Sequence, residues 1–180
     1  MSATVLYMSM SFDGFIAGPN EGPGNGLGDG GHRLHEWFLP GAGAGHKGAA
    51  DRLAGVNREV MDEVMSTGAV VVGRRTFELA DGWGGDHHDG VPIFFETSVE
   101  AAVAKARGLA GGQDIAIAGA TITRGCLDAG LLDAIQVSLV PVILGDGIPW
   151  LAGTRGPVRL SDPEVAEDRG VTHLRYAVRK

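Results

Sequence analysis

The stretch "VVVGRRTFEL", residues 70–79, joins a fully apolar run to two adjacent arginines. Residues 70–72 show no polar alternation, which is typical of a strand buried on both faces of a sheet. Gly73 ends that strand, and the apolar residues after Thr76 predict a short helix that packs back on the sheet. Open α/β sheets bind ligands at the carboxyl ends of their strands, and a helix start offers free backbone N–H groups to an anion. The stretch therefore predicts either an anion site or a solvated turn that happens to be basic.

Two other predicted strands also end in unusual turns. In "SMSFDGFIAG", residues 9–18, Asp13 follows a strand directly, although Asp-Gly is also a common pair in plain turns. In "IAIAGATITRG", residues 115–125, a strand runs into Gly119 and then a helix, which allows either close approach of a ligand or simple close packing. Thr121 can cap that helix, whose dipole then faces a phosphate. Three such turns at one sheet edge predict a ligand site there.

The rest of the chain divides into strands and helices separated by glycine-rich loops. Pro141 lies inside a predicted strand, which indicates an edge position or a bulge. The pattern predicts one α/β domain over residues 1–180, with a mixed, mostly parallel central sheet flanked by helices and a C-terminal antiparallel hairpin. The predicted strands are 3–9, 70–72, 91–95, 114–119 and 134–144, the helices 48–66, 98–107 and 120–129, and the hairpin pairs 158–168 with 170–180.

Composition narrows the class of protein. The chain has 180 residues, 30 of them glycine, and a net charge of −7, so it lacks the basic stripe that a general nucleic-acid binder needs. No segment is apolar enough to span a bilayer, and the first ten residues read as a strand rather than a signal. The single cysteine, Cys126, indicates a reducing compartment. We therefore expect a soluble cytoplasmic protein with no membrane or nucleic-acid partner.

The sequence offers one weak candidate for a metal site. The stretch "GGDHHDG", residues 84–90, carries two histidines and two aspartates. Adjacent side chains alternate in direction, and no distant Cys or Glu pattern completes a ligand set. We therefore expect no metal.

Three motifs together resemble a known family. They are "MSFDGFIA" at residues 10–17, "GRRTFE" at residues 73–78 and "CLDAGLLDAIQVSLVPVILGDG" at residues 126–147. The chain resembles the dihydrofolate reductase superfamily, and most closely the branch built like the reductase domain of bacterial riboflavin biosynthesis proteins. The resemblance implies NADPH-dependent hydride transfer to a small heterocyclic substrate, pteridine-like or ribitylaminopyrimidine-like. The alternative is a non-catalytic protein that keeps the fold and binds a small ligand or nucleotide, or acts only as an assembled scaffold.

The resemblance also implies positions for the cofactor. The nicotinamide would lie near Ser9, Ile16 and Ala17; the adenosine-side phosphates near Gly73, Arg74, Arg75 and Thr76; and the pyrophosphate near Gly119, Ala120, Thr121 and Ile122. Relatives of this branch commonly form two-fold dimers, and the strand at 134–144, apolar on both faces, predicts the same here.

The substrate side departs from the family's pattern. Dihydrofolate reductases proper carry a carboxylate on the long helix, where this chain has Asn57, so folate reduction is not expected. Asp13 becomes the best-placed carboxylate for proton transfer, or else it only holds its own turn.

Three other features bear on the site. Trp37 either covers the substrate or anchors its loop. Relatives have a longer connection where this chain has only residues 96–98, and their Gly-Gly pair is Ala118-Gly119 here.

Overall fold

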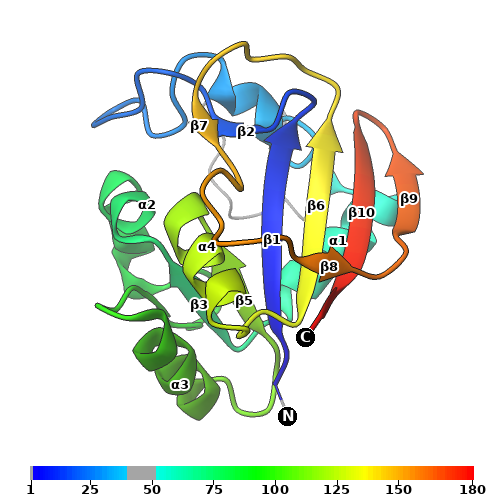
Figure 1. Cartoon of the computed structure of the whole chain (residues 1–180). Coiled ribbons are helices and arrows are strands. Elements are labelled where there is room, and N and C mark those ends of the chain that lie inside the picture. Colours follow the sequence, from blue (N-terminus) through cyan, green and yellow to red (C-terminus); the bar gives the residue numbers. More distant parts are fainter. Residues whose placement is uncertain (1, 40–51) are drawn as a thin grey trace.

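The computed structural model describes residues 2–39 and 52–180 (Figure 1). Within these residues an eight-stranded sheet forms the centre, and β2 and β7 form a separate two-stranded sheet. The elements are β1 (Thr4–Ser11), β2 (Phe15–Ala17), η1 (Gly31–His35), α1 (Gly55–Met65), β3 (Ala69–Val72), α2 (Arg74–Leu79), η3 (Asp81–Gly85), β4 (Ile93–Phe94), α3 (Val99–Leu109), β5 (Ile115–Ala118), α4 (Ala120–Asp128), β6 (Ala134–Val140), β7 (Ile148–Pro149), β8 (Arg159–Leu160), β9 (Glu164–Asp168) and β10 (Val171–Arg179).

The sheet is mixed and mostly parallel, as the sequence predicts. Its order is β4-β3-β5-β1-β6-β10-β8, and neighbouring strands are parallel from β4 to β6. The strand β10 is antiparallel to β6, and it also pairs antiparallel with β8 and β9. The short turn between β9 and β10 makes the predicted C-terminal hairpin. Parallel pairing places the carboxyl ends of β1, β3, β5 and β6 at one edge of the sheet.

The two faces of the sheet differ in character. One face, with Leu6 of β1, packs against α3 and α4 and forms the main apolar core with residues such as Ile117, Val103 and Cys126. The alternation of side chains along a strand places Ser9 on the opposite face, together with Ser138 of β6 and His173 of β10, which are its neighbours in register. The helix α1 packs over this second face, where polar groups are buried at β6 and β10. A smaller apolar cluster with Val70, Val72 and Ala116 lies on the same face at β3 and β5.

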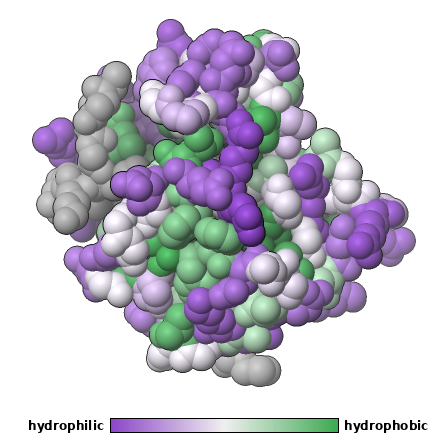
Figure 2. Space-filling model, turned by 90° about the vertical axis from the view of Figure 1, so that its left-hand side faces the viewer, coloured by the Kyte–Doolittle hydropathy of each residue, from purple (hydrophilic) through white to green (hydrophobic). Residues whose placement is uncertain are grey.

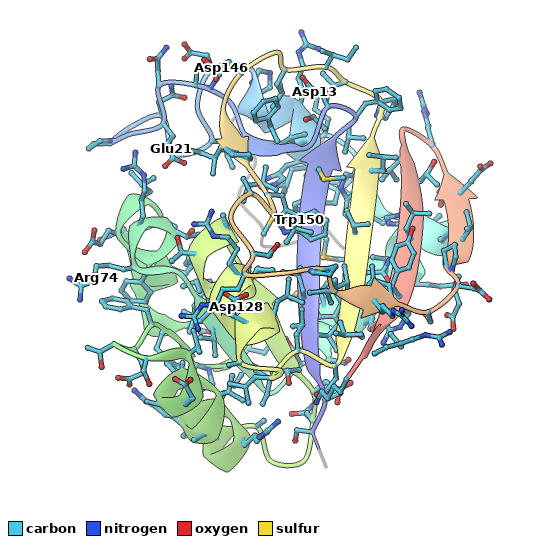
Figure 3. The ribbon with its side chains drawn as sticks, in the orientation of Figure 1. Asp13, Glu21, Arg74, Asp128, Asp146 and Trp150 are labelled. Carbon is cyan, nitrogen blue, oxygen red and sulfur yellow. The ribbon has the colours of Figure 1, made fainter. Side chains whose placement is uncertain are left out.

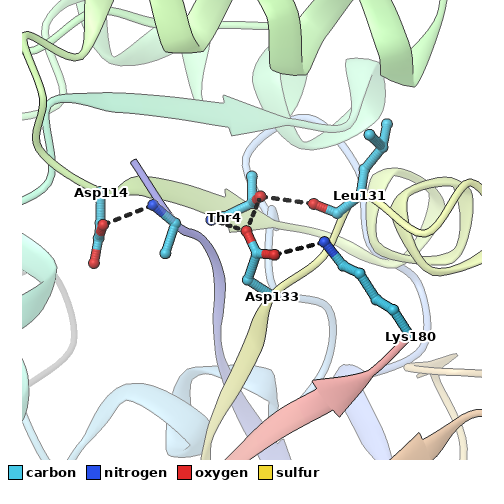
Figure 4. A network of polar contacts seen from close by, with 6 residues as sticks. Thr4, Asp114, Leu131, Asp133 and Lys180 are labelled. Atoms are coloured by element: carbon cyan, nitrogen blue, oxygen red, sulfur yellow. Dashed lines mark hydrogen bonds and ion pairs between the residues drawn. The ribbon is translucent and has the colours of Figure 1, made fainter. Parts of the chain in front are cut away.

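The amino ends of the strands are tied together by hydrogen bonds (Figure 4). The Thr4 hydroxyl donates to the Leu131 carbonyl at 2.6 Å, and the Thr4 backbone N–H donates to Asp133 Oδ2 at 2.9 Å. Lys180 Nζ lies 2.7 Å from Asp133 Oδ1, and the backbone N–H of Ala3 donates to Asp114 Oδ1 at 2.8 Å. These contacts anchor the edge opposite the predicted ligand site.

Several element boundaries differ from the sequence expectation. The helix predicted at 48–66 begins at Gly55, and residues 48–51 lie outside the described part. The strand predicted at 134–144 ends at Val140, so Pro141 lies just beyond it, and β6 is a central strand. Its second face carries Gln136 and Ser138, so the expectation of a strand apolar on both faces was wrong. No helix in the described residues is long and apolar enough to cross a membrane.

Candidate functional site

The turns after β3 and β5 meet at the carboxyl edge of the sheet. Gly73 precedes α2, and Gly119 precedes α4. Gly119 has a φ of +107°, and a Cβ added there would lie 3.0 Å from Thr76 Oγ1 and 3.5 Å from the backbone nitrogen of Gly73. Only a residue without a side chain fits this approach without strain. Two motifs that are 46 residues apart in sequence therefore form one backbone cradle.

The two arginines at the start of α2 have different partners. The Arg74 guanidinium lies 5.1 Å from the ring centroid of Phe95, and it forms no ion pair within the described residues. The Arg75 guanidinium pairs with the Glu21 carboxylate, and its Nη2 donates to the Glu21 carbonyl at 3.1 Å. Figure 3 shows Arg74 and Glu21 on the same side of the molecule. Arg74 is thus open to an external anion, whereas Arg75 already has an internal one.

The surface on this side of the molecule is mixed. Figure 2 shows hydrophobic residues gathered in the middle of the face that carries α2, with hydrophilic residues around and across them.

The connection from β4 to α3 is short, since α3 begins at Val99 and Ser98 caps it by accepting from the Ala101 N–H at 3.1 Å. The short connection inferred from the sequence is therefore present in the fold.

The turn into α4 offers backbone groups more than side chains. The side chain of Ile122 is buried in the main core, and Thr123 Oγ1 donates to the Gly119 carbonyl at 2.6 Å. Thr121 does not cap the helix as the sequence suggested, because Gly119 occupies the N-cap position and no side chain bonds there. Thr121 Oγ1 instead lies 3.4 Å from Arg124 Nη2. Ala120 and Thr121 thus present exposed or half-buried positions at the helix start.

The residues predicted near the nicotinamide lie on β1 and β2. Ser9 is buried, and its Oγ accepts a hydrogen bond from Trp37 Nε1 at 3.0 Å. Ile16 packs against the main core, and Ala17 is buried where β2 pairs with β7. A Cβ on Gly147 would lie 2.0 Å from the Ala17 carbonyl, so the loop after β6 covers this backbone closely.

A buried polar network joins α1 to β6 and β10. His173 Nε2 lies 2.8 Å from Asn57 Oδ1, and His173 Nδ1 lies 3.0 Å from Ser138 Oγ. Asn57 Nδ2 donates to the Arg169 carbonyl at 3.3 Å, and the Trp37 ring packs edge-on against His173 with centroids 4.9 Å apart. Because Asn57 can only accept at Oδ1, His173 carries its proton on Nε2 and accepts from Ser138. Burial lowers the pKa of His173, which favours this neutral form.

The contacts of Trp37 favour one of the alternatives that the sequence left open. Both its N–H and its ring contact the sheet, which favours the role of anchoring its loop, and a position over the substrate stays a prediction. The Asn57 amide is buried and bonded to protein groups on both of its polar atoms. The sequence analysis did not identify Ser138 and His173. The signal that could have found them is a polar residue on each of two neighbouring strands, at positions that face the interior.

A second polar contact on the same face involves Tyr7. The Tyr7 hydroxyl donates to Glu63 Oε1 at 2.8 Å, and Arg175 pairs with the same carboxylate. Burial, followed by the negative charge of Glu63, raises the pKa of Tyr7 well above its ordinary value. Tyr7 is therefore a neutral hydrogen-bond donor at physiological pH.

Comparisons with known proteins gave matches only among solved structures. A riboflavin biosynthesis protein from Shewanella sp. PV-4 matches with a TM-score of 0.62 and 18% identity, covering 99% of both chains. Dihydrofolate reductase from Enterococcus faecalis, solved with NADP(H) and RAB-propyl, matches with a TM-score of 0.55 and 13% identity, covering 99% of this chain and 97% of the other. The chain has a dihydrofolate reductase-like fold.

A third match is longer than this chain. It is the diaminohydroxyphosphoribosylaminopyrimidine deaminase/5-amino-6-(5-phosphoribosylamino)uracil reductase from Thermotoga maritima, with a TM-score of 0.60 and 11% identity. The match covers 98% of this chain but only 56% of the Thermotoga protein. No family model and no curated protein matched the sequence.

Within this dihydrofolate reductase-like fold, Asp13 has the contacts of a structural carboxylate that ties its turn to the loop after β6. It is exposed, and its oxygens accept from the backbone N–H groups of Leu144 at 3.1 Å and Gly145 at 2.7 Å. A hydrogen bond from Ser11, followed by these backbone bonds, holds the pKa of Asp13 below its ordinary value. A carboxylate with a lowered pKa is ionised at neutral pH and is a poor proton donor. The geometry favours the structural role, and the catalytic role stays a prediction.

We expect Asp13→Asn to lower the melting temperature, because an amide has one acceptor oxygen for two backbone N–H groups. Because the pKa of Asp13 is lower in the folded protein than in the unfolded chain, ionised Asp13 stabilises the fold fully above the unfolded-state pKa of about 4. This stabilisation is lost as the pH falls through the folded-state pKa. The variant should lack that acid-sensitive component in thermal melts between neutral pH and pH 3. Asp162→Asn, also exposed, is the matched control. An unchanged melting temperature with abolished turnover would instead support catalysis by Asp13.

The two adjacent histidines do not diverge as the sequence argument assumed. His87 Nδ1 and His88 Nδ1 lie 2.7 Å apart, and the ring centroids are separated by 5.0 Å. The reason is the irregular backbone around them, where Asp89 has a positive φ of 47°. Among the described residues, no group of three or more His, Cys, Asp or Glu side chains is arranged to hold a metal ion.

Proposed function

We propose that this protein is an NADPH-dependent reductase that transfers a hydride to a small heterocyclic substrate of the pteridine or ribitylaminopyrimidine type. The observation that carries the proposal is the contact between the Gly73 and Gly119 turns beside the unpaired Arg74. A backbone cradle between two helix starts suits a diphosphate, and an arginine suits a further phosphate through its planar fork. Solved structures with the same fold include reductases.

The residues present fit a nicotinamide dinucleotide. A Cβ on Gly119 would lie 3.0 Å from Thr76 Oγ1, so the two turns approach each other closely, and the free backbone N–H groups at the start of α4 lie at the same edge. In this proposal Gly73, Thr76, Gly119 and Ala120 hold the diphosphate, and Arg74 holds a phosphate on the adenosine side. The bound cofactor supplies the hydride, while the protein fixes its orientation.

The substrate side argues against folate as the substrate. Asn57 stands where the resemblance places a carboxylate, and its amide is already bonded to His173 and to the Arg169 carbonyl. An amide cannot give up a proton at neutral pH, and this one is buried. We therefore expect a substrate that needs no carboxylate at this position, with its proton coming from Asp13 or from water.

Binding of NADPH tests the proposal most directly. Quenching of the intrinsic tryptophan fluorescence by NADPH, with NADH in parallel, should report saturable binding below millimolar concentration. Arg74→Ala should weaken NADPH binding by about tenfold, because a charged hydrogen bond to phosphate is lost. Arg107→Ala, on the exposed side of α3, should leave the affinity unchanged. Absence of quenching by both dinucleotides would contradict the proposal.

The alternative is a non-catalytic protein with this fold. The short connection between β4 and α3 favours it, because little chain remains there to enclose an adenosine group. A protein of this kind would bind a small ligand without oxidising NADPH. Saturable NADPH binding without NADPH oxidation in the presence of pteridine or ribitylaminopyrimidine substrates would favour this alternative.

Two further expectations stay predictions. The two-fold dimer no longer rests on β6, whose second face is polar, but Phe12 and Ile143 are each 70% exposed beside Pro141 and Val142. A second copy of the chain would cover this apolar surface.

The cytoplasmic location agrees with Cys126, which is buried and free, and burial raises its pKa to about 11.

A further inference from the structure

The pairing of Arg75 with Glu21 is unusual for a surface contact. The Arg75 side chain is 67% exposed, but the Glu21 side chain is only 12% exposed. Arg75 uses two nitrogens on the same residue, Nε for the carboxylate and Nη2 for the backbone carbonyl. Taking a carboxylate out of water is costly unless a cation accompanies it, so Arg75 stabilises Glu21 where it lies.

Glu21 belongs to a loop with its own internal bonds. The Gly18 N–H donates to the Leu27 carbonyl at 2.8 Å, and the Asp29 N–H donates to the Pro19 carbonyl at 2.7 Å. The side chain of Asn20 donates to Asp29 Oδ2 at 2.7 Å. These bonds make residues 18–29 one unit, which the Glu21 pair connects to the first turn of α2.

Resting on the proposed function, we propose that Glu21 is an internal competitor for the cofactor phosphate at Arg75. Arg75 lies in the first turn of α2, directly after the Gly73 cradle, and in the free protein its guanidinium is occupied by the Glu21 carboxylate. A dinucleotide phosphate has to displace this carboxylate to use Arg75. Glu21 therefore lowers the affinity for the dinucleotide.

The burial of Glu21 adds a structural consequence. Once a phosphate takes Arg75, the carboxylate stays nearly buried without its cation, which is unfavourable. Moving residues 18–29 away from α2 returns the carboxylate to water. Dinucleotide binding and the position of this loop are therefore coupled through the two contacts that Arg75 makes with Glu21.

The test is a double-mutant cycle on dinucleotide affinity. Glu21→Gln keeps the shape of the side chain and removes its charge, and it should tighten the binding of NADPH and NADH by roughly three- to tenfold, as the charge pair is lost. In an Arg75→Ala background the same change should have no effect. Glu78→Gln, an exposed acid on α2, is the matched control for a change of net charge. Amide hydrogen exchange of residues 18–29 should become faster in Glu21→Gln without any ligand.

The outcomes separate this proposal from the proposed function. If the wild type binds NADPH and Glu21→Gln binds it with equal or lower affinity, the competitor role is overturned. The proposed dinucleotide site is then unaffected. Binding by neither wild type nor variant overturns both. A melting temperature within a few degrees of wild type confirms that Glu21→Gln folds.

Discussion

Gly119→Ala should weaken NADPH binding at least about tenfold and lower the free energy of unfolding by about 1–3 kcal/mol. The backbone there has a φ of +107°, which side chains rarely adopt, so part of the cost is strain in the folded protein. The added Cβ would also lie 3.0 Å from Thr76 Oγ1 and push apart the turns after β3 and β5. Titration with NADPH and urea unfolding measure the two effects separately.

Gly112→Ala is the control that separates strain from the loss of the site. Gly112 has a φ of +91°, and nothing lies within 4 Å of a Cβ added there. It lies between α3 and β5, at the amino edge of the sheet, away from the cradle. This variant should lose comparable stability and keep its NADPH affinity. Equal loss of affinity in both variants would mean that general destabilisation, rather than the cradle, weakens binding.

The fold could be predicted because its signals are local. Residues 70–72 and 115–118 are apolar runs that each end at a glycine, and these strands and the helices after them lie close to where the sequence predicted them. Parallel pairing then places their carboxyl ends at one edge, so the cradle at Gly73 and Gly119 follows from topology. The end of β6 was misjudged because the apolar residues on both sides of Pro141 continue the strand pattern.

The polar partners could not be predicted, because they come from distant parts of the chain. Glu21 and Arg75 are 54 residues apart, and Asn57 and His173 are 116 apart. Nothing in the local pattern around Glu21 distinguishes it from a solvated loop residue. Asp13 shows the same limit, since its partners at Leu144 and Gly145 belong to the loop after β6.

His173→Phe should cost about 2–5 kcal/mol of the free energy of unfolding, because it leaves two buried polar groups without partners. The His173 ring bonds Asn57 Oδ1 through Nε2 at 2.8 Å and Ser138 Oγ through Nδ1 at 3.0 Å. Phenylalanine has a ring of similar size but no hydrogen-bonding atom, so both bonds are lost. Replacing all three residues together, as His173→Phe, Asn57→Leu and Ser138→Ala, should recover part of the loss. Removing every partner of a buried polar network costs less than removing one.

The same variant should change how stability depends on pH. Burial lowers the pKa of His173 in the folded protein, so the unfolded chain takes up its proton first. The stabilisation from the neutral ring is therefore complete above the unfolded value of about pH 6.5 and decreases as the pH falls toward the folded-state pKa. Urea unfolding at a series of pH values between about 7.5 and 5 should show a smaller dependence of stability on pH for His173→Phe than for wild type. An unchanged slope in His173→Phe would assign this titration to another group.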